Sequence, residues 1–99
     1  MPSAPIDIDA KHPVFAGHFP GRPIVPGVML LDHAQRAIEA ATGLHLQGLA
    51  ATKFLSAAVP GDALVLDHEL TDGGVRFTIR SGERVVANGR FVARVKDAA

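Results

Sequence analysis

Apolar and polar residues alternate through most of the second half of the chain, with the period of two that is typical of half-buried β-strands. The alternating runs and the two Gly-containing turns between them are 63–70, Asp72-Gly73-Gly74, 75–80, Ser81-Gly82-Glu83 and 85–95. Both turns suit tight hairpins. An earlier strand is expected over about 48–58, before the break at Pro60-Gly61-Asp62. The pattern predicts an antiparallel meander of about four strands.

A single helix is predicted from about Pro26-Gly27 to Gly43. Proline suits the first turn because its missing N–H has no partner inside a helix there, and glycine commonly ends helices. The helix opens with the four apolar residues 28–31 and becomes amphipathic only later. We therefore expect its start to be buried nearly all round. One buried helix with a curved antiparallel sheet around it gives an α+β fold.

Composition narrows the class of protein. The 99 residues, 47% of them apolar, suit one globular domain spanning residues 1–99. A domain of this size is marginally stable alone, and the chain has no cysteine for disulfides, so a dimer is plausible. Ten basic residues balance ten acidic ones and there is no Tyr or Trp, which argues against nucleic-acid binding. No apolar segment approaches the roughly 20 residues of a membrane span, and the N-terminus lacks a signal-peptide pattern, so a cytoplasmic location is expected.

Candidate chemistry gathers where a Pro- and Gly-rich segment, 12–27, meets the predicted helix. The prolines and glycines of this segment, which interrupt helices and strands, alternate with apolar residues. This pattern indicates a packed, rigid loop. His18 lies in that loop, where an apolar setting would favour neutral imidazole. Asp32 lies about 1.5 turns into the helix, where burying a lone carboxylate is costly. The Gly27 N–H at the helix N-terminus would favour a developing negative charge, such as that on a thioester oxygen.

Each of these signals also has a purely structural interpretation. A lone loop histidine is more often structural, an early helical aspartate can complement the helix dipole, and Pro-Gly is common before helices. Only their combination, a base, an acid and an oxyanion site at one helix start, favours an active site. The remaining histidines, His12, His33, His45 and His68, are scattered and predict no metal site, and the alternating Arg76, Arg80, Arg90 and Arg94 predict a solvated sheet face.

The run from Gly17 to Asp32 closely resembles the signature of the β-hydroxyacyl-acyl-carrier-protein dehydratases of the FabA/FabZ type. The shared features are His18-Phe19-Pro20-Gly21, then Pro26-Gly27-Val28, then an acidic residue. His18 and Asp32 are 14 positions apart, the spacing of the family's catalytic pair. A second stretch, Lys53-Phe54 with Val59-Pro60-Gly61-Asp62, is similar to another segment of the family.

The resemblance implies a hotdog fold, in which an antiparallel sheet wraps around a central helix, and a dimer with two sites at its interface. His18 of one subunit would face Asp32 of the other. His18 would remove the proton α to the thioester, and Asp32, protonated or through water, would assist departure of the β-hydroxyl. The Gly27 N–H would polarise the thioester carbonyl. The adjoining Phe19, Pro26 and Val28 would bind substrate, and no metal or organic cofactor is implied.

Departures from the family pattern bear on specificity and partners. The family's commoner dehydratases have Glu at the acidic position, whereas the branch that also isomerises the double bond has Asp, as here. Only Ile6-Asp7-Ile8-Asp9 is available as an N-terminal strand. Leu55 replaces the basic residue that follows Lys-Phe in the family, which weakens the case for standard docking of the acyl carrier protein. The residues that could still contact the carrier or its phosphopantetheine are Arg22, Arg36 and Lys53.

Three hypotheses follow. The first is a dehydratase acting on β-hydroxyacyl thioesters, with the acyl group on a carrier protein, in fatty-acid or specialised polyene or polyketide-like synthesis. The second is a related hotdog enoyl-thioester hydratase or a thioesterase, because a fold does not fix function. The third is a non-catalytic acyl-binding module. The expected assembly is a homodimer or higher homo-oligomer, or a heterodimer with a related subunit.

Overall fold

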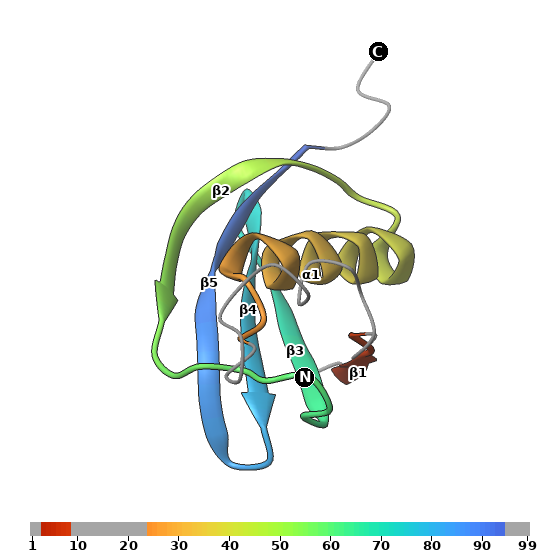
Figure 1. Cartoon of the computed structure of the whole chain (residues 1–99). Coiled ribbons are helices and arrows are strands. Elements are labelled where there is room, and N and C mark those ends of the chain that lie inside the picture. Colours follow the sequence, from red (N-terminus) through yellow and green to blue (C-terminus); the bar gives the residue numbers. More distant parts are fainter. Residues whose placement is uncertain (1–2, 9–23, 95–99) are drawn as a thin grey trace.

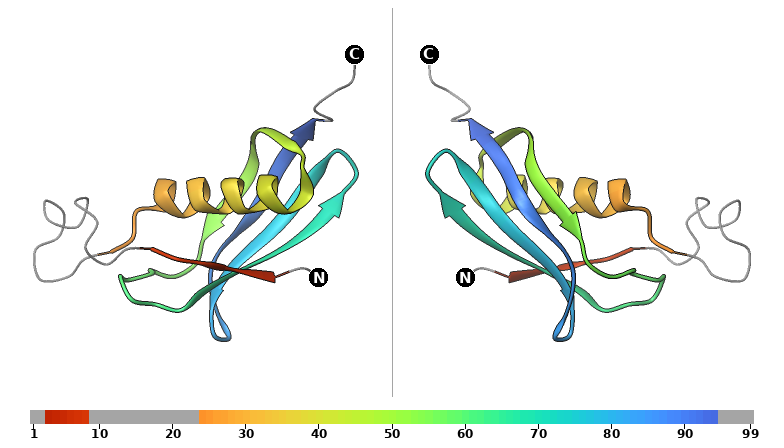
Figure 2. Two further views of the ribbon diagram at one scale, coloured as in Figure 1. Left: turned by 90° about the vertical axis from the view of Figure 1, so that its right-hand side faces the viewer. Right: turned by 90° about the vertical axis from the view of Figure 1, so that its left-hand side faces the viewer.

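The computed structural model describes residues 3–8 and 24–94 (Figure 1). Of Arg94, only the backbone is described. Its elements, in chain order, are β1 (Ser3–Ile6), α1 (Gly27–Thr42), β2 (His45–Phe54), β3 (Leu64–Thr71), β4 (Gly74–Ser81) and β5 (Arg84–Arg94). The five strands form one sheet in the order β1-β3-β4-β5-β2, and every neighbouring pair is antiparallel. The side views in Figure 2 show α1 lying across one face of this curved sheet.

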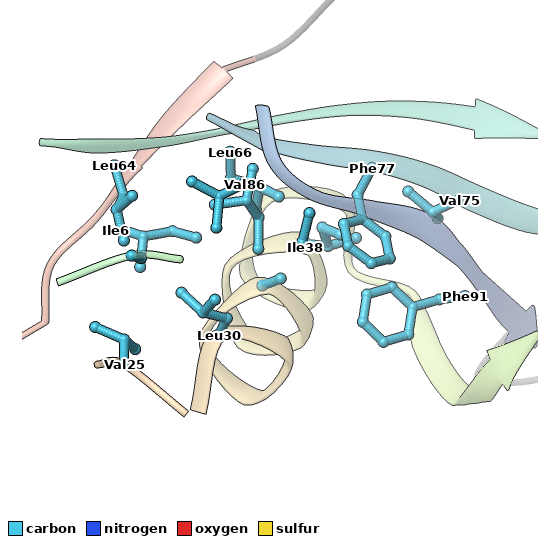
Figure 3. Packing of buried hydrophobic residues seen from close by; sticks show 14 of the residues in the cluster. Ile6, Val25, Leu30, Ile38, Leu64, Leu66, Val75, Phe77, Val86 and Phe91 are labelled. Carbon is cyan, nitrogen blue, oxygen red and sulfur yellow. The ribbon is translucent and has the colours of Figure 1, made fainter. Parts of the chain in front are cut away.

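The core lies between α1 and the sheet because alternate strand residues point to the same face. In Figure 3 Leu30 and Ile38 reach from the helix toward side chains of the strands. Phe77 of β4 and Phe91 of β5 belong to this core and stack on each other, with ring centroids 4.9 Å apart. The predicted α+β arrangement of one helix against an antiparallel sheet is therefore confirmed.

The helix begins and ends where the sequence predicts. Pro26 is its N-cap residue, with extended backbone, and Gly43 is its C-cap, at a φ of 74° that glycine adopts without steric cost. The buried face consists of Leu30, Ala34 and Ile38, spaced four residues apart. Val28 is 77% exposed. The expectation that the helix start is buried nearly all round is wrong for the single chain, because the sheet covers only one side of it.

Two predicted strands are placed differently by the structure. β1 ends at Ile6, so the N-terminal strand is Ser3–Ile6 and not Ile6–Asp9. β2 covers 45–54, not 48–58, and it pairs with β5 and not with β3, so the meander is limited to β3, β4 and β5. After Phe54 the N–H of Leu55 still donates to the carbonyl of Val86 on β5 (2.8 Å). The chain then turns away, and Ala58 accepts a hydrogen bond from the N–H of Val25 (2.8 Å).

Candidate active site

The start of α1 presents unpartnered backbone donors. The N–H groups of Met29 and Leu30 both donate to the carbonyl of Pro26, at 3.0 and 3.2 Å. Among the described residues, no acceptor is recorded for the N–H of Gly27 or Val28. These groups lie at the positive end of the helix dipole, so they can stabilise a negatively charged oxygen.

An apolar groove of about 390 Å³ adjoins this helix start. It is formed by the segment before the helix, the first turn of α1, the end of β2 and the residues that follow it. Its lining residues are Ile24, Val25, Gly27, Leu30, Phe54, Leu55, Ser56, Ala57 and Ala58. None of them carries a charged side chain. A groove lined mostly by apolar residues, with the backbone donor of Gly27 among them, suits an apolar chain that carries one polar head.

Phe54, the last residue of β2, leans against Gly27. A Cβ atom built on Gly27 would lie 2.6 Å from Cζ of the Phe54 ring and 2.9 Å from its Cε1. Such distances are far below van der Waals contact, so the ring fills the space that a side chain at position 27 would need. The sequence indicates Lys53-Phe54 as a family motif and Phe54 as a residue whose packing bears on acyl chain length. It does not predict the contact with Gly27, because the pairing of β2 with β5 that places Phe54 here is long-range.

Asp32 lies on the outward face of α1. Its carboxylate is 3.2 Å from Nε of Arg36, one helical turn later, and its side chain is 55% exposed. Asp32 follows Leu30 by two residues, which turns it about 200° around the helix, away from the groove that Leu30 lines. The cost of burying a lone carboxylate, which the sequence suggested for Asp32, is therefore absent in the single chain.

Some of the other predicted site residues lie within the described part of the chain, and some lie outside it. His18, Phe19 and Arg22 lie outside the described residues, so their position relative to Asp32 stays a prediction. Pro26 is partly buried at the helix cap, and Lys53 is exposed at the end of β2.

The remaining described histidines do not converge on one site. His68 is buried on β3, and no partner is recorded for its Nδ1 within the described part of the chain. No group of three or more His, Asp or Glu side chains in that part is arranged to hold a metal ion.

The clearest electrostatic effect lies away from the groove, where β1 meets β3 and β4. Asp67 accepts hydrogen bonds from Nε of Arg80 (2.7 Å) and from the hydroxyl of Ser3. The bond from Arg80 and then that from Ser3 hold the pKa of the Asp67 carboxyl below its usual value. Arg80, expected on a solvated face, is thus engaged in an ion pair.

None of the helices in the described residues could cross a membrane.

Comparison with known proteins places these features in context. The model of the ApeI-like family, described as ApeI dehydratase, matches residues 3–90. The 3-hydroxyacyl-[acyl-carrier-protein] dehydratase FabZ of Chlamydia trachomatis is 34% identical over 101 residues, which cover 86% of this chain and 66% of the relative. FabZ of Enterococcus faecalis is 33% identical, over 91% of this chain and 70% of the relative. The chain thus spans about two thirds of the length of these curated relatives.

Solved structures agree on the fold. The dehydratase heterocomplex ApeI:P from Xenorhabdus doucetiae aligns with a TM-score of 0.77 and 22% identity, over 92% of this chain and 84% of that one. The pyran synthase domain from module nine of the sorangicin pathway aligns with a TM-score of 0.73 and 25% identity, over 98% of this chain and 35% of that one. The hotdog fold expected from the sequence is confirmed.

Proposed function

Because the chain belongs to the ApeI-like dehydratase family, we propose that it is a 3-hydroxyacyl-[acyl-carrier-protein] dehydratase. It removes water from β-hydroxyacyl thioesters and gives trans-2-enoyl thioesters, in fatty-acid or polyketide-like synthesis. The family match confirms the resemblance to FabA/FabZ-type dehydratases that the segments around His18 and Lys53-Phe54 indicate. The cytoplasmic location and the single-domain organisation stay predictions.

In the proposed reaction, His18 takes the proton from the carbon α to the thioester. The electron pair of the broken C–H bond forms the new double bond, and the β-hydroxyl leaves. Asp32, directly or through a water molecule, supplies the proton that lets it leave as water. The N–H of Gly27 stabilises negative charge that develops on the thioester oxygen in the transition state.

One structural observation carries this proposal: Gly27, whose N–H has no acceptor among the described residues, lines a groove of mostly apolar residues without a charged side chain. A thioester has the matching chemistry, with a polar carbonyl at the end of an apolar acyl chain. The outward position of Asp32 means that the proposed reaction needs a second chain. Since Asp32 faces away from the groove of its own chain, its carboxylate serves the groove of a second chain.

The assembly we propose joins two chains along β2. This strand lies at the edge of the sheet formed by residues 3–8 and 24–94, and no strand in that part of the chain pairs with its outer side. Large exposed apolar side chains gather on β2, on the segment after it and around the helix start, namely Ile24, Val28, Leu49, Phe54, Leu55 and Val59. A second copy would cover them and bring its own Asp32 to the groove. A related subunit would do the same in a heterodimer, and the solved ApeI:P neighbour is described as a heterocomplex.

The acyl group is proposed to arrive on an acyl carrier protein, the carrier in the names of the FabZ relatives. Lys53 is exposed beside Phe54 and is free to meet an acidic partner. Arg36 is exposed as well, although it pairs with Asp32 in the single chain. Substrate contacts of Phe19, Pro26 and Val28 and a carrier contact of Arg22 complete the proposed site.

The proposal is tested by the reverse reaction, hydration of crotonyl or decenoyl thioesters. We expect His18→Ala and Asp32→Asn each to abolish turnover while the circular dichroism spectrum and oligomeric state stay unchanged. Asp72→Asn, in the exposed turn between β3 and β4, is the matched control and keeps full activity. Unimpaired turnover in either site variant contradicts the assignment.

The alternatives give other results in the same experiment. A thioesterase releases free thiol without forming the hydroxyacyl product, and an acyl-binding module shows neither reaction. Double-bond isomerisation, which the Asp at position 32 leaves open, is read from the ratio of trans-2 to cis-3 products.

A further inference from the structure

The contact between Phe54 and Gly27 limits what fits at the start of the helix. The end of the ring, Cζ with both Cε atoms, lies within 2.6–3.2 Å of the place that a methyl group on Gly27 would occupy. Among the groups outside the helix, the nearest to that place is the side chain of Phe54 at the end of β2. The same ring lines the apolar groove that opens beside Gly27.

About half of the Phe54 side chain is exposed in the single chain. Phe54 is 52% exposed and lies at the end of an edge strand, and its residue partner on β5 is Ala87, a small side chain. It does not belong to the buried core. The exposed ring therefore takes no part in the core of its own chain, and its place beside Gly27, among the residues that line the groove, fits a wall of the binding site.

We propose that Phe54 is a specificity-determining residue whose ring narrows the groove beside Gly27 and restricts the enzyme to thioesters without a branch at the α-carbon. This inference rests on the proposed function, because it assumes that the thioester carbonyl meets the Gly27 N–H. The α-carbon is bonded to that carbonyl carbon, so a methyl group on it lies close to the Phe54 ring. A linear acyl chain presents only hydrogen atoms there and passes along the groove.

The test compares hydration of two thioesters of pantetheine that differ by one methyl group, crotonyl and 2-methylcrotonyl. The wild-type chain is expected to prefer crotonyl by about 10- to 200-fold in kcat/KM, beyond the intrinsic difference in reactivity of the two thioesters, since one misplaced methyl group costs that much in a fitted site. Phe54→Ala removes the wall, so we expect this preference to fall by about tenfold or more. The gain comes from a lower KM for 2-methylcrotonyl. Phe54→Leu, which keeps an apolar side chain, gives an intermediate preference.

Leu70→Ala is the matched control, because Leu70 is an apolar residue on β3 of comparable exposure (60%, against 52% for Phe54) and does not line this groove. The Leu70→Ala enzyme is expected to keep the wild-type preference for crotonyl over 2-methylcrotonyl thioester. A Phe54→Ala enzyme that loses activity equally on both thioesters, or keeps the wild-type preference, overturns the inference. A wild-type chain that hydrates neither thioester refutes the proposed function itself, so the two failures are distinguishable.

A second experiment tests the contact between Phe54 and position 27 directly. Gly27→Ala places a methyl group against the ring, so it lowers crotonyl turnover, and adding Phe54→Ala to it restores part of that loss. If the double variant is no better than Gly27→Ala alone, the ring is not what the methyl group meets, and the proposal fails.

Discussion

Leu30 and Val28 lie two residues apart on α1, yet the structure assigns them opposite environments. Leu30 is 2% exposed and packs in the core, while Val28 is 77% exposed on the far side of the helix. Leu30→Ala removes three buried carbon atoms and leaves a cavity, which costs about 2–5 kcal/mol. The whole free energy of unfolding for a chain of this size is about 5–15 kcal/mol, so this single change removes a large part of it.

Val28→Ala is the contrasting change. At an exposed position the expected loss is within about 0.5 kcal/mol, as long as the assembly state does not change. If Val28 lies in the proposed interface, however, the variant dissociates at a higher protein concentration than the wild type, because apolar area buried between chains is lost.

Both variants are measured by urea unfolding at several protein concentrations, with sedimentation velocity to fix the assembly state. We expect a large, concentration-independent loss for Leu30→Ala and a concentration-dependent one for Val28→Ala. A loss below about 1 kcal/mol for Leu30→Ala would refute the packing described for α1. A Val28→Ala variant with unchanged assembly at every concentration removes that residue from the interface.

Three further changes test local features. Arg80→Gln removes the hydrogen bond that does most to lower the pKa of Asp67, while the bond from Ser3 remains. The lowered pKa stabilises the fold above the ordinary pKa of Asp and loses this effect as pH falls. The wild type should therefore lose more Tm than the variant between about pH 7 and pH 3, and equal losses would contradict this. Gly43→Ala forces a side chain onto a φ of 74° and should cost about 1–2 kcal/mol in urea unfolding; a neutral effect is incompatible with the observed cap. Arg36→Gln should change stability by less than about 1 kcal/mol but raise KM for carrier-linked substrates alone, and an equal rise for pantetheine thioesters would exclude a carrier contact.

The sequence predicts most elements of the fold correctly because their signals are local. The helix bounds follow from Pro26 and Gly43, and the hairpin turns follow from Asp72-Gly73-Gly74 and Ser81-Gly82-Glu83, whose effects extend over a few residues only. The position of β2 could not be predicted in the same way. Its apolar run continues past Phe54, and only pairing with β5, more than thirty residues later, decides where the strand ends.

The sequence names candidate site residues but does not predict how they are arranged. The motif names Gly27 and Asp32 as candidates, and the structure places them on different sides of the helix in one chain. Asp32 was expected to be costly to bury; instead it is exposed and paired with Arg36, because only one face of α1 meets the sheet. The role of Phe54 depends on a contact between distant segments, which no local pattern reports.

Mixing two inactive variants tests the central claim most directly, namely that His18 of one chain and Asp32 of another form each site. After subunit exchange between equal amounts of His18→Ala and Asp32→Asn, half of the dimers contain one chain of each kind. Each such dimer has one intact site, so hydration of crotonyl thioester should recover to about a quarter of the wild-type rate. Wild-type protein taken through the same exchange is the control. A mixture that stays inactive, while the control keeps its activity and exchange is verified with differently tagged chains, contradicts the shared site.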